Sequence, residues 1–455
     1  MRTIEEICAG HRAFYAAGAT KDIPFRVAAL RRLEQAIRTH EGEVLAALKD
    51  DLNKSAFEGY ETEVGLVYGE LKDAIAHTAR WAKPKRVSTP IIHFPSSSAI
   101  LKEPYGTVLV MAPWNYPFQL TMNPLIGAVA AGNCCVLKPS EYAPRTAEVI
   151  EKLVAEAFDP GHVSVVRGGR AANASLLDQR FDSIFFTGSP AVGRVVMQAA
   201  AQNLTPVTLE LGGKSPCIVD ETADTALAAR RIIWGKCLNA GQTCIAPDYL
   251  FVHRTKKDAL MEEMKKAIRA FYGETPECCE EYPKIINDKH FARLKRLMED
   301  GHILTGGRIN EKTRQIAPTL IDGVTFESPI MQEEIFGPLF PVFTFERMEE
   351  VYAFVESRPK PLACYLFSND KKTIDETMNR LSFGGGCVND TITHIANAHL
   401  PFGGVGESGM GQYHGKRSFD VFTHEKAVLK KGRWPDIPVR YPPYKNKLNL
   451  LKKIL

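Results

Sequence analysis

The sequence has no apolar run long enough to cross a membrane. Its longest one extends from Leu125 to Leu137 and includes Asn133, so it is shorter than the roughly 20 residues that a spanning helix needs. Near the N-terminus, Glu5 and Glu6 stand where a secretion signal would have its apolar segment. The sequence therefore predicts a cytoplasmic protein without a transmembrane segment, in which the ten cysteines are reduced thiols.

An excess of charge of one sign is also lacking. The 57 Lys and Arg residues nearly balance the 53 Asp and Glu residues, for a net charge of +4, which argues against a nucleic-acid partner. No C-x-x-C or H-E-x-x-H pattern occurs, so we expect no metal site. The composition, 45% hydrophobic and 24% charged, is typical of globular proteins, and 455 residues suffice for two or three domains.

The order of apolar and polar residues predicts an α/β protein. Helices are expected up to about residue 83, followed by an extended, proline-rich hairpin over 84–105. Fully apolar strands such as Thr107–Ala112 then alternate with helices, which favours a parallel sheet covered on both faces. A second series over 215–410 predicts a second α/β domain. After about residue 425 the chain becomes basic and ends in KLNLLKKIL, which fits either a membrane-surface segment or a helix docked at a subunit boundary.

Three glycine patterns are candidates for a phosphate-binding loop. Residues 404–409 match G-x-G-x-x-G, but no apolar strand precedes them. Residues 213–215 are similar to the end of a Walker A loop, but Thr208 stands where its first glycine should be. Residues 188–193 follow the apolar strand 184–186 and begin a helix, where free N–H groups suit a phosphate. An ordinary strand–helix turn explains this third pattern equally well.

Three residues are candidates for catalysis. Cys244 lies in a segment, 239–247, whose Gly, Asn and Pro indicate a loop, although a lone cysteine is more often a small core residue. Glu210 is an acid inside an apolar strand, where burial would raise its pKa and suit a general base, unless the side chain points to solvent. Asn115 lies in 113–117, directly after a predicted strand, where α/β folds bind ligands, although Asn is also common in turns.

Taken together, the motifs resemble those of the NAD(P)-dependent aldehyde dehydrogenase family. They cover essentially the whole chain in the family's order: PWNYP (113–117), LKPSE (137–141), FTGS (186–189), LELGGKSP (209–216), GQTC (241–244), EEIFGP (333–338) and PFGGVGESGMG (401–411). Because PWNYP begins so early, the chain is most like the class 3 branch. The resemblance implies a Rossmann-like NAD(P)-binding domain, an α/β catalytic domain, and a small β oligomerisation arm with a C-terminal tail. The NAD(P)-binding domain would comprise residues 1–83 and 106–210, and the catalytic domain residues 211–412. The arm and the tail would comprise residues 84–105 and 413–455.

The resemblance also implies roles for individual residues. Cys244 is similar to the nucleophile, Glu210 to the general base and Asn115 to the oxyanion donor. Lys138 and Glu141 are similar to the adenosine-ribose contacts, and a carboxylate at Glu141 favours NAD over NADP, although class 3 enzymes often accept both. The other positions similar to cofactor-binding residues are Gly188, Ser189 and Val192 of the Rossmann turn, Leu211, and Glu334 and Phe336 near the nicotinamide.

The implied activity is oxidation of an aldehyde to the carboxylic acid through a cysteine thiohemiacetal and a thioester. Class 3 similarity implies medium- or long-chain aliphatic or aromatic aldehydes and a homodimer. Two alternatives remain open. A CoA-acylating aldehyde dehydrogenase shares the fold and the cysteine but generally lacks the glutamate base. A non-catalytic structural relative would be expected to have lost Cys244, Glu210 or Asn115, and all three are present.

Overall fold

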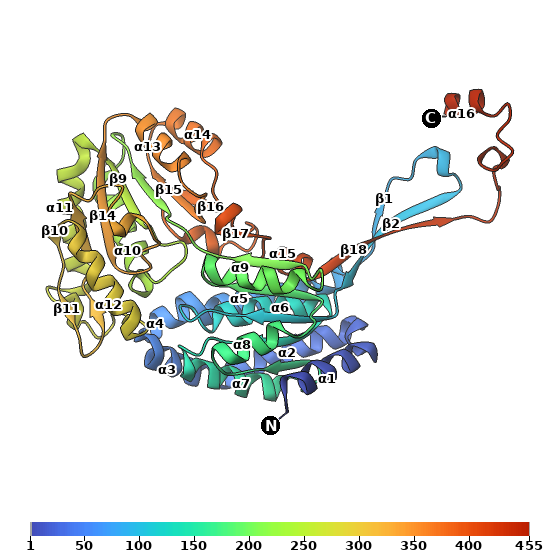
Figure 1. Ribbon diagram of the computed structural model, residues 1–455, viewed down its shortest axis with the longest axis horizontal. Coiled ribbons are helices and arrows are strands. Elements are labelled where there is room, and N and C mark those ends of the chain that lie inside the picture. The colour runs from blue at the N-terminus through green and yellow to red at the C-terminus, as the bar shows by residue number, and fades with distance from the viewer. Residues whose placement is uncertain (1, 455) are drawn as a thin grey trace.

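The computed structural model describes residues 2–454, which form two α/β units and an arm that projects away from both (Figure 1). One unit contains a six-stranded sheet and the N-terminal helices, and the other contains a seven-stranded sheet. The arm is a three-stranded sheet followed by the C-terminal segment. The predicted α/β fold with largely parallel sheets is confirmed.

Helices dominate the N-terminal region, as the apolar spacing predicts. The first one begins at a capping box, in which Thr3 Oγ1 accepts a hydrogen bond from the Glu6 N–H (3.2 Å) and Glu6 Oε2 accepts one from the Thr3 N–H (2.8 Å). A π-helical turn, Tyr60–Val64, lies between the last two helices. The helices are α1 (Ile4–Ala16), α2 (Ile23–Thr39), α3 (Glu41–Leu52), α4 (Ala56–Gly59) and α5 (Gly65–Trp81).

The six-stranded sheet has the order β17-β7-β6-β3-β4-β5, and only β17 is antiparallel to its neighbour. Each of the central strands is fully buried, because helices cover both faces of a parallel sheet. The first strand ends at Met111 rather than at Ala112. The strands are β3 (Thr107–Met111), β4 (Cys134–Lys138), β5 (Val163–Val165), β6 (Ser183–Thr187), β7 (Val207–Glu210) and β17 (Gly409–Met410).

The helices α6, α7, α8 and α9 connect the parallel strands of this unit. Every residue of α6 is buried, because α6 packs between β3, β4 and the helices α2 and α5. Helix α15 also packs on α6, so the chain returns to this unit before it enters the arm. The helices are α6 (Gln119–Ala131), α7 (Pro144–Ala157), α8 (Arg170–Leu177), α9 (Pro190–Ala201) and α15 (Lys416–Val421).

The seven-stranded sheet has the order β10-β13-β14-β9-β8-β15-β16, with only β10 antiparallel to its neighbour. Its strands are β8 (Pro216–Val219), β9 (Tyr249–His253), β10 (His302–Thr305), β13 (Thr319–Asp322), β14 (Leu339–Phe345), β15 (Ala363–Phe367) and β16 (Gly385–Val388). A short hairpin joins β11 (Ile309–Asn310) and β12 (Gln315–Ile316). The helices are α10 (Thr225–Cys237), α11 (Lys257–Tyr272), α12 (Asp288–Leu297), α13 (Met348–Glu356) and α14 (Lys371–Arg380).

The predicted hairpin over 84–105 is confirmed as β1 (Lys85–Val87) paired with β2 (Ser96–Pro104). The third strand, β18 (Thr423–Lys431), pairs with β2 along its whole length. It begins at Thr423, directly after α15. Beyond it, the chain ends in α16 (Leu448–Ile454).

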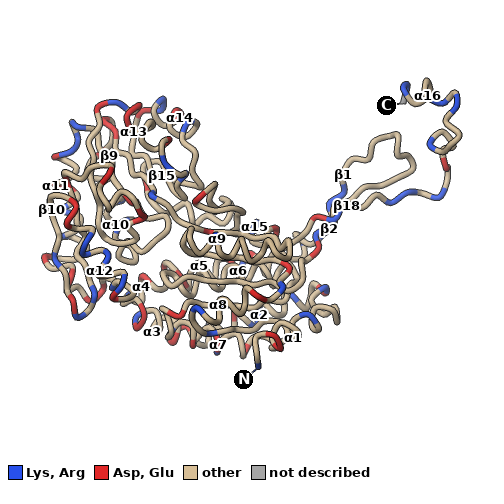
Figure 2. Tube along the Cα trace, in the orientation of Figure 1, with Lys and Arg blue, Asp and Glu red and all other residues tan. Residues whose placement is uncertain are grey.

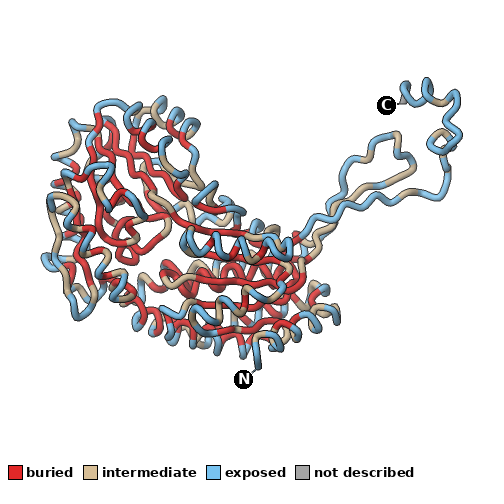
Figure 3. Tube along the Cα trace, viewed as in Figure 1, coloured by how far each residue is buried: buried red, intermediate tan, exposed pale blue. Residues whose placement is uncertain are grey.

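The arm has no core of its own. Figure 3 shows buried residues throughout both α/β units, whereas the arm and tail are exposed or only half-buried outside the base of the sheet. Lysine and arginine follow its strands and the tail (Figure 2). No helix among residues 2–454 is long and apolar enough to cross a membrane.

Candidate active site

The loops after four parallel strands meet at one edge of the six-stranded sheet. Strands β3, β4, β6 and β7 run in the same direction, so their carboxyl ends share that edge, where open α/β sheets bind ligands. Seven of the predicted site residues stand at the ends of these strands or in the loops after them: Asn115, Lys138, Glu141, Gly188, Ser189, Glu210 and Leu211.

Cys244 and Glu210 line one cavity of about 200 Å³. The cavity lies between the two units, because Glu210 ends β7 of one sheet and Cys244 lies in the loop between α10 and β9 of the other. Its walls are mainly apolar and are formed by Leu66, Leu120, Trp234, Leu238, Ile245, Ile392, Ile395, Ala396 and Phe402. A small reacting group with an apolar substituent would fit such a cavity.

The Glu210 side chain points inward rather than to solvent. It is only 2% exposed, and neither of its carboxylate oxygens has a hydrogen-bond partner among the described residues. This burial raises the pKa of Glu210 well above its usual range. A carboxyl group with both oxygens free and a raised pKa is suited to accept a proton from a ligand in the cavity.

Cys244 is partly exposed in the loop, which agrees with an accessible thiol. Burial raises the pKa of the Cys244 thiol, and the nearby carboxylates of Glu334 and Glu210 raise it further. The backbone N–H groups of Cys244 and Ile245 act in the opposite direction. Because the thiolate is the nucleophilic form, this cysteine needs a proton acceptor nearby.

The segment before Cys244 has an unusual backbone. Asn239, Ala240 and Gly241 all have positive φ values, of 52°, 51° and 74°. At Gly241 a Cβ atom would also collide with the Gly337 carbonyl group, so only glycine fits there. Non-glycine residues in the left-handed region are held there by their surroundings, and they concentrate at functional sites.

Asn115 is buried and joined to the Cys244 loop. Its side-chain Nδ2 donates to the Gln242 carbonyl oxygen at 3.0 Å. Its own carbonyl oxygen accepts from Asn239 Nδ2 at 2.7 Å and from Lys54 Nζ at 3.1 Å. Since an amide nitrogen carries two N–H groups, the second one has no hydrogen-bond partner among the described residues, and Asn115 itself does not line the cavity.

Lys138 and Glu141 lie together at the end of β4. Lys138 is 3% exposed, and its ammonium donates to the Pro139 carbonyl oxygen at 2.7 Å. Burial lowers the pKa of Lys138, while Glu141 opposes that effect. The Glu141 carboxylate folds over Gly169, where a Cβ atom would collide with it. A buried ammonium with donors left over beside a carboxylate fits a hydroxyl-bearing ligand such as a nucleotide ribose.

The turn between β6 and α9 has the form that the glycine pattern predicts. Ser189 caps α9 by accepting from the Val192 N–H at 3.4 Å, and the Gly188 N–H donates to the Glu210 carbonyl oxygen at 3.0 Å. Leu211 packs against Gly193, where an added Cβ would lie 2.8 Å from the Leu211 side chain. Val192 is 43% exposed, so the N-terminal end of α9 is accessible to an anionic group.

Glu334 and Phe336 come from the segment before β14. Burial raises the pKa of Glu334 to about 8. Its carboxylate lies against Gly212, where a Cβ atom would be 2.6 Å from Oε1. Phe336 has a φ of 50°, and its ring meets the edge of Trp114 with 5.3 Å between centroids. The second unit thus places both residues beside the loops of the first.

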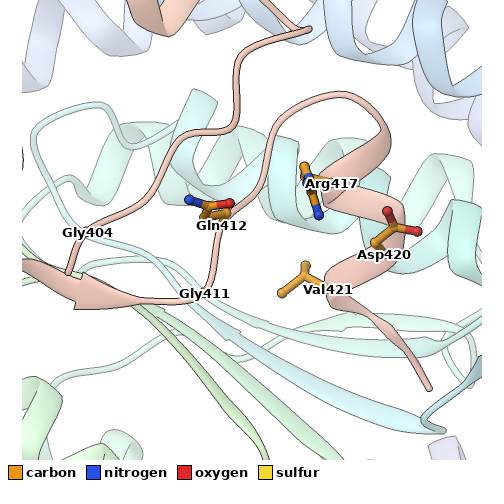
Figure 4. A pocket seen from close by; sticks show the side chains of 6 residues that line it. All are labelled: Gly404, Gly411, Gln412, Arg417, Asp420 and Val421. Carbon is orange, nitrogen blue, oxygen red and sulfur yellow. The ribbon is translucent and has the colours of Figure 1, made fainter. Parts of the chain in front are cut away.

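The literal G-x-G-x-x-G pattern at 404–409 forms no strand–helix turn. Gly406–Ser408 is a short 3₁₀ turn, and the next residues form β17. This segment borders a separate hollow of about 430 Å³, which Figure 4 shows between Gly404, Gly411 and the α15 residues Arg417 and Asp420. The residues that line it are not those that line the Cys244 cavity.

Two residues of the site have no sequence pattern that singles them out. Lys54 and Glu63 form a fully buried ion pair, with 2.5 Å between Nζ and Oε1, and Lys54 contacts the Asn115 loop. Tyr116 and Thr243, which belong to the PWNYP and GQTC motifs, hydrogen-bond through their hydroxyl groups at 2.5 Å beside the cavity. No cluster of three His, Cys, Asp or Glu side chains among residues 2–454 is placed to hold a metal ion.

Comparison with known proteins identifies the family. The profile of the aldehyde dehydrogenase family matches residues 3–428. A 4,4'-diaponeurosporen-aldehyde dehydrogenase of Staphylococcus aureus is 50% identical, with 99% of each chain covered. A dimeric, NADP-preferring aldehyde dehydrogenase of Rattus norvegicus is 43% identical over 97% of this chain and 100% of its own. The substrate-bound structure of Staphylococcus aureus AldH superposes with a TM-score of 0.98 at 49% identity, covering 100% of this chain and 99% of that one.

The fold and these matches define an oxidoreductase that acts on aldehydes with NAD(P)+. The chain belongs to the aldehyde dehydrogenase family and oxidises aldehydes. The similarity to the class 3 branch is confirmed, since family 3 members from Arabidopsis thaliana and Mus musculus are 45% and 43% identical to it.

Proposed function

We propose that Cys244 is the nucleophile of this oxidation, Glu210 the general base and Asn115 a donor to the oxyanion. The observation that carries the proposal is that Cys244 and the unpartnered Glu210 carboxyl group line the same apolar cavity. Asn115 supports it, because its amide is tied to the carbonyl oxygen of Gln242, which closely precedes Cys244.

The first step is attack of the Cys244 sulfur on the aldehyde carbon. The thiol proton passes to Glu210, and the former carbonyl oxygen takes up the negative charge. The free N–H of Asn115 and the backbone N–H of Cys244 stabilise that charge, and one such donor contributes about 2.7–4 kcal/mol. The chemistry that bound NAD(P)+ supplies is acceptance of the hydride from the substrate carbon.

The second step is hydrolysis of the thioester left on Cys244. With its proton released to solvent, Glu210 takes a proton from a water molecule whose oxygen attacks the thioester carbon. The carbon–sulfur bond breaks, the carboxylic acid is released, and the proton held by Glu210 passes to the sulfur, which regenerates the Cys244 thiol. Because the raised pKa of Glu210 makes its carboxylate a stronger base, the residue is well suited to this proton transfer.

The cofactor residues are proposed from their positions. Lys138 and Glu141 would hold the adenosine ribose, and the N-terminal end of α9 with Ser189 would hold the diphosphate. Gly188, Val192 and Leu211 shape that turn, while Glu334 and Phe336 would contact the nicotinamide half. We further propose a preference for NAD, because a carboxylate at Glu141 would repel the 2′-phosphate of NADP.

The apolar cavity favours medium- or long-chain aliphatic or aromatic aldehydes, since its walls carry few polar atoms. The arm favours a homodimer. Its sheet exposes both faces, and Ile91 and Phe94 at its tip are 78% and 54% exposed. A sheet without a core needs a partner surface to be stable.

Mass spectrometry of the acid-quenched enzyme tests the proposed chemistry. With NAD+ and a long-chain aldehyde, we expect the acyl mass on the Cys244 peptide alone. An acyl group on any other residue would overturn the assignment, and a rate that requires CoA without release of free acid would indicate the CoA-acylating alternative. A series of aldehydes of increasing chain length should give kcat/KM values that rise with length, and light scattering should give the mass of a dimer.

A further inference from the structure

Two buried charged residues from other segments of the chain contact the loop that carries Asn115. Lys54 lies in the loop between α3 and α4, and Glu63 lies in the π-helical turn between α4 and α5. Both side chains are fully buried, and they form an ion pair with 2.5 Å between Nζ and Oε1. The contacts of this pair are with the segment 115–119.

Each partner of the pair contacts a different end of that segment. Lys54 Nζ donates to the Asn115 carbonyl oxygen at 3.1 Å. The second oxygen of Glu63, Oε2, accepts from the N–H groups of Phe118 at 2.8 Å and Gln119 at 3.1 Å. Between these ends, the Lys54 ammonium lies 3.9 Å from the centre of the Tyr116 ring.

We propose that the Lys54–Glu63 pair is a positioning device for the Asn115 amide. Buried ion pairs stabilise a fold poorly compared with apolar packing, because both charges must leave water. Here every polar contact of the pair other than the ion pair itself falls on the Asn115 loop. The pair fixes the distance between this loop and the Cys244 segment. At that distance the free N–H of Asn115 points to the oxygen of a bound carbonyl group.

A hydrogen-bonded ring shows how the position is transmitted. The Asn115 carbonyl oxygen accepts hydrogen bonds from Lys54 Nζ and Asn239 Nδ2. The Asn115 side-chain N–H donates to the Gln242 carbonyl oxygen. Asn239 Nδ2 also donates to the Gln242 carbonyl oxygen at 3.1 Å. A shift of Lys54 would therefore change the spacing between Asn115 and Cys244, and misplacement by about 1 Å can lower a rate about 10²-fold.

This inference rests on the proposed role of Asn115, so the test must separate the two. Two reagents report on Cys244 differently. Alkylation by iodoacetamide needs only the thiolate, whereas acylation by p-nitrophenyl acetate also develops an oxyanion. The variants are Asn115→Ala, the double variant Lys54→Met/Glu63→Gln, which removes both charges together, and the triple variant. Lys152→Met, which removes the exposed Lys152–Glu43 pair, is the matched control.

We expect Asn115→Ala to slow acylation about 10²–10³-fold, and the double variant to slow it about 10-fold. The triple variant should be no slower than Asn115→Ala, because Lys54 and Glu63 act through Asn115. Alkylation should stay within about 2-fold in all of them, and Lys152→Met should match the wild type in both assays. Glu63→Asp keeps both charges but cannot reach both Lys54 and the loop, so it should slow acylation even if the double variant does not fold.

Three results would overturn the inference: acylation by the double variant at the wild-type rate, equal slowing of acylation and alkylation, or further slowing of Asn115→Ala by the double change. Acylation by Asn115→Ala at the wild-type rate would instead overturn the proposed role of Asn115 itself.

Discussion

The side chain of Asn115 donates a hydrogen bond of 3.0 Å to the carbonyl oxygen of Gln242. Asn115 follows a strand of the six-stranded sheet, and Gln242 belongs to the loop before β9 of the seven-stranded sheet. This bond therefore joins the two units at the point where Cys244 and Glu210 share a cavity. The proposed oxyanion donor is thus tied to the loop that carries the proposed nucleophile, and the bond from Asn239 Nδ2 to the Asn115 carbonyl oxygen supports the same connection.

Replacement of Cys244 by alanine is expected to lower aldehyde-dependent NADH formation roughly 10³-fold or more. No other side chain lining the cavity carries a thiol. The measurement is steady-state absorbance of NADH with a long-chain aldehyde. Cys278→Ala, at an exposed cysteine, is the control and should retain wild-type turnover. Substantial turnover by Cys244→Ala would refute the assignment of the nucleophile.

Replacement of Glu210 by glutamine should slow both steps of the reaction, because Glu210 accepts the thiol proton in the first step and a water proton in the second. The first equivalent of NADH should form more slowly than in the wild type, and the steady-state rate should be lowered about 10²–10⁴-fold. Stopped-flow absorbance measures both phases. Glu407→Gln, at an exposed acid, is the control. Unchanged steady-state turnover in Glu210→Gln would contradict the role of the base.

Replacement of Glu141 by serine should shift the cofactor preference toward NADP. The carboxylate lies beside Lys138 at the proposed ribose site, and removal of one like charge is expected to raise the NADP/NAD ratio of kcat/KM roughly 10-fold. Initial rates with each nucleotide give the ratio. Glu262→Ser, on the surface of α11, should leave it unchanged, and an unaltered ratio in Glu141→Ser would argue against this contact.

His162 should make the fold sensitive to acid. Burial lowers the pKa of His162 from 6.5 to about 4, and the ring lies among Phe14, Phe25 and Phe158. Because the pKa of His162 is lower in the folded protein, the unfolded chain binds a proton at a higher pH than the folded protein does. The contribution of His162 to the free energy of unfolding is therefore complete above pH 6.5 and is lost as the pH falls through about 4, by roughly 3 kcal/mol.

Urea unfolding at several pH values measures this effect. His162→Gln should show a smaller loss of unfolding free energy between pH 6.5 and pH 4 than the wild type. His40→Gln provides the contrast, because Glu43 and Glu156 raise the pKa of the half-buried His40, and its contribution is instead lost as the pH rises. Identical pH profiles for the wild type and His162→Gln would contradict the prediction.

Much of the fold follows from local patterns. The alternation of apolar strands with helices predicts the parallel sheet that contains β3, β4 and β6, because a strand buried on both faces must be apolar throughout. The hairpin over 84–105 follows from its prolines, which exclude helices. By contrast, the return of residues 409–410 to the first sheet as β17 has no local signal, because a short antiparallel edge strand depends on its partner.

The sequence by itself determined the fold class, the family and the identity of the candidate residues, because their motifs stand in a fixed order along the chain. Only the tertiary structure decided that Glu210 is buried without a partner, that it shares a cavity with Cys244, and that Lys54 and Glu63 hold the Asn115 loop. These relationships join segments far apart in the chain. Their strength depends on desolvation and on distances between atoms, which arise only when both sheets are packed together.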